Sequence, residues 1–373
     1  MLKRFDLGRL TENGLRRGFT TGSAAAAAAL AAVMRLVRGE VLRAVDVPLP
    51  DGEHFLRIAI RGTGELEGGG VWAEVEKDGG DDPDQTHRAV IRVVVRRNMK
   101  LGIRYLRGEG VGVVTRPGLR VAVGEAAINP VPRAMIAAAV ETVDVGLDFD
   151  VEVGCLGGEE IARRTFNPRL GIEGGISILG TTGVVEPKSM LSFRASIEVY
   201  VRVAMGEMAP EIVLTPGNLG QRFARSELDL PTHRVVQMSN FVGFALGCVT
   251  ECVRERGERL RRLWVVGHPG KLCKVLADVW DTHSSGGPSA MDALRSARFA
   301  LLENGAFALV ASVEELIVAM AGVEPKVRDA FWRSVCVRIA ACVGARTEGV
   351  EEVRVVLFGL DGSRLGEGGW LGN

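Results

Sequence analysis

The sequence has no C-x-x-C pair of cysteines. Its six cysteines are spread over the chain without a C-x-x-C motif, and most of them stand among apolar residues with helical spacing. Without such pairs, neither a disulfide framework nor a metal site is indicated. We therefore predict reduced thiols in the core and no metal held by the protein itself.

The sequence also lacks a net charge and a long apolar run. Lysine plus arginine number 46, and so do aspartate plus glutamate, so nucleic acid is not expected as a partner. Charged residues interrupt the N-terminal segment, and the alanine-rich run after Ser23 reaches Arg35 before the roughly 20 apolar residues that a membrane span needs. We expect a soluble cytoplasmic protein without a membrane segment, and a homo-oligomer is compatible with this composition.

The length is sufficient for two ordinary domains, each with its own core: the chain has 373 residues. Residues 1–170 combine short strands, of which Ala89–Arg97 is the clearest, with a few helices, and this pattern predicts an α+β domain. Residues 171–373 repeat a strand, a turn and a helix, which predicts an α/β domain with a mostly parallel sheet. The linker is expected at Asn167–Leu170.

Four strand–turn–helix units are predicted to share one edge of the second-domain sheet. Their strands are Ile176–Leu179, Ile212–Leu214, Val235–Met238 and Leu263–Val266. Ligands bind at the carboxyl ends of such strands, and glycines in the following turns permit a close approach of the backbone. The residues predicted to bind a cofactor at this edge are Gly180, Thr181, Thr182, Gly183, Gly217 and Gly267.

A hydroxyl-rich turn precedes the alanine-rich helix predicted over Ala24–Val37. Thr20, Thr21 and Ser23 stand where a helix presents free backbone N–H groups, so one of them can simply cap the helix. Together they could instead bind a carboxylate or a phosphate. Arg133, in the first turn of a second predicted helix, is a further candidate for binding an anion or for an ordinary surface ion pair.

An acidic loop, KDGGDDPDQTH, runs from Lys77 to His87 between two predicted strands. One interpretation is a solvated turn without a function, because runs of charged residues usually face water. As a functional feature it could hold a cation or accept a proton, since neighbouring carboxylates can raise the pKa of one another. The later glutamate of an EF-hand loop is missing, so that calcium motif is excluded.

Seven short motifs along the chain together resemble those of one known family. They are GFTTGS from Gly18, KDGGDDPDQTH from Lys77, INPVPR from Ile128, NPRLGIEGGISILGTTGVVEP from Asn167, TPGN from Thr215, SNFVGFAL from Ser239 and VVGHPGKL from Val265. Their number and order resemble the CbiD family, the cobalt-precorrin-5B C(1)-methyltransferases of anaerobic cobalamin biosynthesis. The chain departs from the family pattern at Ser23-Ala24, Leu219, Met238 and Asp281.

The resemblance implies methylation of ring carbon 1 of cobalt-precorrin-5B by S-adenosyl-L-methionine, giving cobalt-precorrin-6A. The cobalt is carried by the tetrapyrrole substrate and not by the protein. The resemblance also implies a first domain like the second domain of ribosomal protein S5. Because the ring carbon is nucleophilic and the sulfonium is already activated, positioning should supply most of the acceleration.

The implied reaction needs a proton acceptor and groups that bind an anionic ring. The candidate acceptors are Asp81, Asp82 and His268. A tetrapyrrole carries several carboxylates, so hydroxyl, N–H and cationic groups next to the matching motifs are candidates for binding it. The residues predicted to bind the substrate are Thr20, Thr21, Ser23, Arg133 and Lys271.

Two functions from other classes stay open. A GHMP-type small-molecule kinase also places a glycine- and serine-rich turn before an alanine-rich helix, although its longer Gly-Leu-Gly-Ser-Ser pattern and Walker A spacing are absent here. A non-catalytic tetrapyrrole carrier would need a wide pocket but no second site for S-adenosylmethionine. Binding of S-adenosylmethionine therefore separates the three functions.

Overall fold

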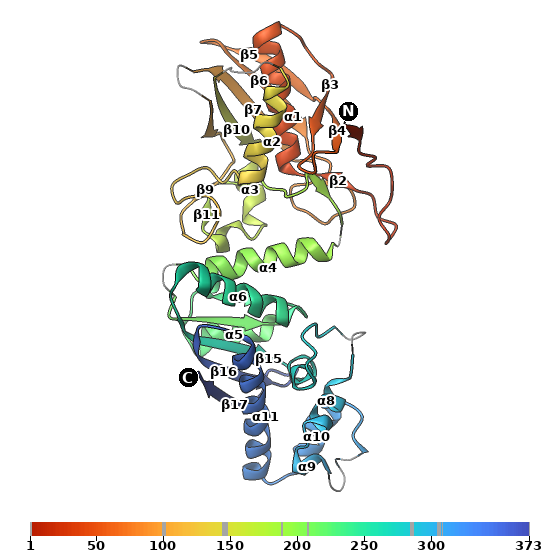
Figure 1. Cartoon of the computed structure of the whole chain (residues 1–373), viewed down its shortest axis with the longest axis vertical. Coiled ribbons are helices and arrows are strands. Elements are labelled where there is room, and N and C mark those ends of the chain that lie inside the picture. The colour runs from red at the N-terminus through yellow and green to blue at the C-terminus, as the bar shows by residue number, and fades with distance from the viewer. Residues whose placement is uncertain are drawn as a thin grey trace. The chain divides into compact units, whose positions relative to one another are not determined.

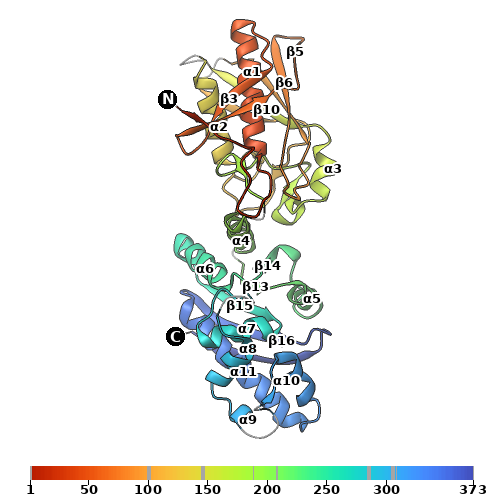
Figure 2. The same ribbon diagram turned by 90° about the vertical axis from the view of Figure 1, so that its right-hand side faces the viewer.

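The structure, a computed structural model, describes residues 2–98, 102–143, 148–187, 189–206, 209–283, 287–303, 307 and 309–372. It divides into two compact units, Met1–Ser192 and Phe193–Asn373. Each unit has its own β-structure (Figures 1 and 2). Each also has its own hydrophobic core.

Unit 1 is built on a five-stranded sheet with the order β5-β6-β7-β10-β8. The strands are β5 (Gly62–Leu66), β6 (Gly70–Glu76), β7 (Val90–Arg97), β8 (Ile103–Arg107) and β10 (Phe149–Cys155). Neighbours are antiparallel, except that β10 and β8 are parallel. Helices α1 (Thr21–Arg38) and α2 (Pro130–Glu141) lie side by side, and α1 packs on β6 and β7 (Figure 1). Unit 1 is therefore a mixed fold of strands and helices.

Short elements complete unit 1. A three-stranded sheet has the order β1 (Lys3–Arg4), β4 (His54–Ala59), β3 (Ala44–Pro48). Two further pairs are β9 (Val113–Val114) with β11 (Ile172–Glu173), and β2 (Gly18–Phe19) with β12 (Val184–Val185). Helix α3 spans Gly158–Arg163 and a 3-10 helix spans Asn167–Leu170.

Helix α1 is buried on all sides over most of its length. Every residue from Thr21 to Val33 is buried, and residues 24–29, all alanine, have no exposed surface. The small alanine side chain lets the sheet and α2 approach the helix closely. Thr20 caps the amino end, and Gly39, in the left-handed region at φ 70°, ends the helix.

Three glycines let three segments of unit 1 cross at backbone distance. A Cβ built on Gly110 would lie 2.1 Å from the Cys155 carbonyl oxygen. A Cβ on Gly158 or Gly175 would lie 2.1 Å or 2.3 Å from the carbonyl oxygen of Gly110. Only a hydrogen atom fits in these places, so the glycines draw the segment that begins at Gly171 into unit 1.

Unit 1 consequently ends after Ser192, later than the boundary predicted after Leu170. The run Ile176–Leu179, predicted as the first strand of the parallel sheet, instead lies in unit 1, where Ile176 bridges Val111 and Ile178 bridges Ile128. The prediction that four strand–turn–helix units share one sheet edge is therefore wrong for the first of them. The glycine crossing is the physical reason.

Unit 2 contains the expected, mostly parallel sheet, with the order β14-β13-β15-β16-β17. Its strands are β13 (Glu211–Thr215), β14 (Val235–Gln237), β15 (Leu260–Gly267), β16 (Val350–Phe358) and β17 (Arg364–Leu371). The first four in the sheet order are parallel, and β17 runs antiparallel to β16. The three later units predicted from the sequence thus supply β13, β14 and β15.

Helices cover both faces of the unit 2 sheet. Phe223 of α5 packs with Val213, Trp264 and Val356 on one face, whereas α6 and α11 pack with the alternate residues of the same strands on the other. The helices are α4 (Met190–Ala204), in which the division between the units falls, α5 (Asn218–Ser226), α6 (Val242–Arg256), α7 (Pro269–Leu272), α8 (Ala290–Ser296), α9 (Ala300–Glu303), α10 (Val313–Met320) and α11 (Pro325–Arg346); two 3-10 helices span Thr232–Arg234 and Cys273–Ala277. This arrangement is a doubly wound α/β fold.

Membrane-spanning helices and clusters of metal ligands are both absent from the part of the chain that the structure describes. No helix among them is long and apolar enough to cross a membrane. No group of three or more histidine, cysteine or acidic residues among them could hold a metal ion. All six cysteines are unpaired, as predicted, and burial raises the pKa of the Cys155 thiol to about 11.

Candidate functional site

The predicted site residues divide between the two units. Those in unit 1 are Thr20, Thr21, Ser23, Asp81, Asp82, Arg133, Gly180, Thr181, Thr182 and Gly183, and those in unit 2 are Gly217, Gly267, His268 and Lys271. The residues predicted to bind the cofactor are therefore not all on one sheet edge.

The hydroxyl groups at the start of α1 hold a loop of the same unit. Thr21 Oγ1 accepts a hydrogen bond from the Leu179 N–H (2.9 Å) and donates to the Leu179 carbonyl oxygen (3.2 Å). Ser23 Oγ donates to the Gly183 carbonyl oxygen (2.6 Å), and Thr20 Oγ1 accepts from the Ser23 N–H (3.1 Å). The capping role is thus confirmed for Thr20, whereas binding of a carboxylate by these groups stays a prediction.

The loop held by these hydroxyls contains Gly180, Thr181, Thr182 and Gly183. Both glycines have positive φ, 137° and 81°, and a Cβ on Gly180 would lie 2.4 Å from Thr20 Oγ1. The two threonines are exposed, and Thr182 Oγ1 donates to the Val184 carbonyl oxygen (3.0 Å). The glycines therefore serve the packing of the loop on α1, and contact of the loop with a cofactor remains a prediction.

Replacing Thr21 by valine is expected to destabilise unit 1. Valine keeps the shape but leaves the partly buried Leu179 N–H without its acceptor, which should cost about 1 kcal/mol. Denaturant unfolding measures the loss. Thr142→Val is a control, because the Thr142 hydroxyl donates to the Ala139 carbonyl oxygen at the end of α2, outside the loop that Thr21 holds. A raised Michaelis constant for the tetrapyrrole without a loss of stability would instead support carboxylate binding by Thr21.

The acidic loop lies against the strand that leads into α1. The Phe19 N–H donates to the Asp78 carbonyl oxygen (2.7 Å), and a Cβ on Gly18 would lie 2.3 Å from the Gly79 carbonyl carbon. Asp81 accepts hydrogen bonds from the Arg16 N–H (2.7 Å) and from its guanidinium Nε (3.4 Å). Because β2 also pairs with β12, residues 16–23, 77–87 and 177–186 form one cluster in unit 1, which we call the loop cluster.

The nearest charges keep two of the loop carboxylates ionised. The Arg16 N–H, assisted by the guanidinium, lowers the pKa of Asp81. Burial acts to raise the pKa of Asp84, but the Lys77 ammonium and the hydrogen bonds from Lys77 and Thr86 outweigh it, and the pKa is lowered. The prediction that the carboxylates of this loop raise the pKa of one another is wrong for these two, because cations and N–H groups lie closer.

Arg133 is engaged within unit 1. Its Nε donates to the Ile128 carbonyl oxygen (2.8 Å), and its Nη2 donates to Glu125 Oε2 (2.7 Å). The ring of Tyr105 lies 5.6 Å from the guanidinium carbon, a cation–π contact. The ordinary ion pair considered for Arg133 is thus present, and binding of an anion by this side chain stays a prediction.

In unit 2, the carboxyl edge of the sheet has the geometry of a ligand site. Strand β13 lies between β14 and β15, and the helices that follow β13 and β15 pack on opposite faces of the sheet. In doubly wound folds, ligands bind at the carboxyl ends of the strands where the chain changes face in this way. A Cβ on Gly217, in the turn after β13, would have no atom within 4 Å. A Cβ on Gly267, at the end of β15, would lie 2.9 Å from Pro216 Cδ. Gly217 therefore borders open space, while Gly267 lets the two turns touch.

His268 and Lys271 follow β15 at this edge. His268 Nδ1 accepts the Gly270 N–H (3.1 Å), which places the ring proton on Nε2. Within the described part of the chain, this buried Nε2 has no hydrogen-bond partner, and Glu314 Oε1 lies 3.7 Å away. Burial lowers the pKa of His268, so the ring is neutral at pH 7 and its acceptor nitrogen is occupied. Lys271 is half-buried in α7.

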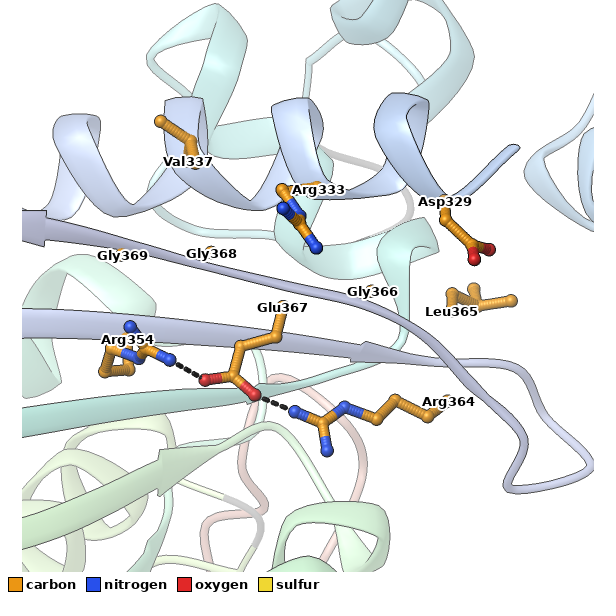
Figure 3. A pocket seen from close by; sticks show the side chains of 10 residues that line it. All are labelled: Asp329, Arg333, Val337, Arg354, Arg364, Leu365, Gly366, Glu367, Gly368 and Gly369. Carbon is orange, nitrogen blue, oxygen red and sulfur yellow. Dashed lines mark hydrogen bonds and ion pairs between the residues drawn. The ribbon is translucent and has the colours of Figure 1, made fainter. Parts of the chain in front are cut away.

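A groove of 650 Å³ lies beside β17 in unit 2, and none of the residues selected from the sequence lines it. Figure 3 shows Glu367 between Arg354 and Arg364, with both of which it forms ion pairs. Arg333 and Val337 of α11 border the groove from the helix side (Figure 3). The only sequence signal for this surface is the charged, glycine-rich run from Arg364 to Gly369, which is typical of an edge strand.

Comparisons with known proteins connect the whole chain to one family. The CbiD family model matches residues 9–187. The cobalt-precorrin-5B C(1)-methyltransferase of Ralstonia nicotianae is 47% identical, covering 98% of this chain and 97% of that protein. The proteins of the same name from Chromobacterium violaceum and Moorella thermoacetica are 45% and 42% identical and cover 97% and 94% of this chain.

A solved structure of a family member is also similar. The crystal structure of cobalamin biosynthesis protein (cbiD) from Archaeoglobus fulgidus covers 67% of this chain and 87% of its own, with 27% identity and a TM-score of 0.39. Identity above 40% over nearly the full length of the curated relatives shows the family without this structure. The chain belongs to the CbiD family.

Proposed function

We propose that the chain transfers a methyl group from S-adenosylmethionine to ring carbon 1 of cobalt-precorrin-5B, giving cobalt-precorrin-6A in anaerobic cobalamin biosynthesis. The observation that carries this proposal is the 42–47% identity, over at least 94% of the chain, to three proteins named for the C(1)-methylation of cobalt-precorrin-5B. The cobalt arrives with the substrate.

The methyl donor is assigned to the carboxyl edge of unit 2, between the turns after β13 and β15. Support comes from the strand order, which places the change of face at this edge, and from the free space beside Gly217. The loop Gly180–Gly183 lies in unit 1, where its two glycines pack against Thr20 and Ser23 at the start of α1. We therefore assign Gly180, Thr181, Thr182 and Gly183 to the proposed tetrapyrrole site instead of the donor site.

The tetrapyrrole is assigned to the loop cluster of unit 1. In the reaction, the electron pair of C1 forms a bond to the methyl carbon while the carbon–sulfur bond breaks and leaves a neutral thioether. The positive charge of the sulfonium passes to the ring until a proton is lost. The carboxylates of Asp81 and Asp82 would stabilise that charge, which is an electrostatic role and needs no raised pKa. The lowered pKa of Asp81 suits this role. His268 is then a structural histidine.

The fold of unit 1 is proposed to be that of the second domain of ribosomal protein S5. The support is the pair of neighbouring helices, α1 and α2, beside one largely antiparallel sheet (Figure 2). In this fold the proposed tetrapyrrole site lies at the amino end of α1.

Replacing Asp81 by asparagine is expected to slow methyl transfer with little change in melting temperature. The amide keeps an oxygen for the Arg16 N–H but removes the negative charge, so turnover should fall by roughly tenfold to a hundredfold if the charge stabilises the cationic ring. Asp46→Asn is the matched control, because Asp46 forms a comparably exposed ion pair with Arg57 in unit 1. Equal turnover of the two variants would assign the acidic loop to the solvated surface.

A single assay separates the proposed methyltransferase from the other candidates. Purified protein is titrated with S-adenosylmethionine in a calorimeter and then incubated with cobalt-precorrin-5B and methyl-labelled donor. Donor binding and one labelled methyl group per ring are expected. Binding of the ring without binding of the donor would instead indicate a carrier, and ATP-dependent phosphate transfer would indicate a kinase.

A further inference from the structure

Lys77 is a buried cation next to the proposed tetrapyrrole site, and no step of the proposed reaction uses it. It follows β6, and its side chain is only 1% exposed. Its Nζ lies 2.6 Å from Asp84 Oδ2. A buried ammonium is stable only with a partner, so this ion pair constrains the position of both residues.

Asp84 connects Lys77 to the rest of the acidic loop through hydrogen bonds. Its carboxylate also accepts hydrogen bonds from the Thr86 N–H (2.9 Å) and the Thr86 hydroxyl (2.6 Å), and its carbonyl oxygen accepts the His87 N–H (3.1 Å). His87 Nδ1 in turn accepts the Gly79 N–H (3.0 Å). An unbroken series of contacts therefore runs from the ammonium to the backbone at the tip of the loop.

The loop tip carries the groups that meet the rest of the loop cluster. Asp78 accepts the Phe19 N–H through its carbonyl oxygen and the Gly80 N–H (2.9 Å) through its carboxylate. The Asp81 N–H donates to the Arg16 carbonyl oxygen (3.1 Å). The direction in which the Asp78 and Asp81 carboxylates point thus depends on the loop conformation that the Lys77–Asp84 pair stabilises.

We propose that Lys77 is a positioning residue for methyl transfer, which acts through Asp84 to hold the side chains of Asp78 and Asp81 in place. This inference rests on the proposed function, in which the Asp81 carboxylate stabilises the positive charge on the ring. Lys77 itself is too deeply buried to contact the substrate, and its charge is balanced by Asp84.

The test is a double-mutant cycle with Lys77→Met, Asp84→Asn and the combined variant, assayed with S-adenosylmethionine and cobalt-precorrin-5B. Each single variant is expected to lose about tenfold to a hundredfold in kcat, with donor affinity unchanged. The double variant should be no slower than the slower single variant, because both changes break the same contact. Losses that multiply, or a change confined to the Michaelis constants, would overturn the inference.

Glu74→Gln is the matched control. Glu74 is also buried, on β6, and forms ion pairs with Arg61 and Arg92 outside the loop cluster. The Glu74→Gln protein should be less stable than the wild type but should have the same kcat. A Lys77→Met protein with the same kcat loss as Glu74→Gln would reduce Lys77 to a stability role.

Hydrogen exchange distinguishes a failure of this inference from a failure of the proposed function. Faster exchange of the Gly79 and Gly80 amides is expected in folded Lys77→Met and folded Asp84→Asn, and unchanged exchange in both would overturn the positioning role. A wild-type protein that transfers no methyl group would overturn the proposed function, while the exchange data would still report on the loop.

Discussion

Gly175→Ala is expected to unfold unit 1 or to leave it severely destabilised. The added methyl carbon would lie 2.3 Å from the carbonyl oxygen of Gly110 and 2.6 Å from the carbonyl carbon of Val111. Both neighbours are backbone atoms, which cannot turn aside as a side chain can, so the cost should reach about 3 kcal/mol or more. Denaturant unfolding followed by circular dichroism measures it.

The same substitution elsewhere in unit 1 provides the control. A Cβ on Gly62, in β5, would lie 3.5 Å from the Trp72 ring, which is an ordinary contact. Gly62→Ala should therefore change the free energy of unfolding by less than about 1 kcal/mol. Equal stabilities for the two variants would show that the three segments do not cross at backbone distance.

Gly217→Val is expected to abolish most of the affinity for S-adenosylmethionine while the protein stays folded. Gly217 has an extended backbone that valine adopts, and its Cβ position is free of protein atoms, so nothing in the chain opposes the substitution. If the donor occupies that space, the isopropyl group should weaken binding by roughly tenfold to a hundredfold, corresponding to about 1.4–2.8 kcal/mol. Calorimetric titration with S-adenosylmethionine measures the change.

Gly247→Val controls for the substitution itself. Gly247 is exposed on α6, and its Cβ position is also free of neighbouring atoms. Its affinity for the donor should match that of the wild type. Gly183 is unsuitable as a probe, because its φ of 81° and a Cβ position 2.5 Å from Leu49 Cδ2 would destabilise the loop cluster directly. Full affinity in Gly217→Val would move the donor site away from this edge.

Sequence reasoning succeeded where local pattern and tertiary structure agree. The runs Ile212–Leu214, Val235–Met238 and Leu263–Val266 became β13, β14 and β15, because each apolar run is followed by a polar turn and a helix within a few residues. The run Ile176–Leu179 has the same local pattern. Its partners, however, are Val111 and Ile128, which stand far away in the sequence, so no local signal could place it in unit 1.

The chemistry of the candidate site could also be predicted only in part, because it depends on contacts between segments that are distant in the sequence. The density of carboxylates in the acidic loop is visible in the sequence, but the pKa of each depends on neighbours that the fold supplies. Arg16 approaches Asp81 from a distant segment and lowers its pKa, opposite to the direction predicted. Lys77 opens the loop motif and could have been selected as its counter-charge, although its burial becomes visible only in the structure.

The alanine content of α1 has a consequence for the entropy of unit 1. Alanine has no rotatable χ angle that folding must fix, so the central turns of α1 are buried at almost no cost in side-chain conformational entropy. A folded helix without alternative rotamers also has few ways to shift within its packing. The turn at Thr20 is therefore attached to a rigid helix, at the place where α1 meets the acidic loop and the Gly180–Gly183 loop. A ligand that binds there would cost the protein little further conformational entropy.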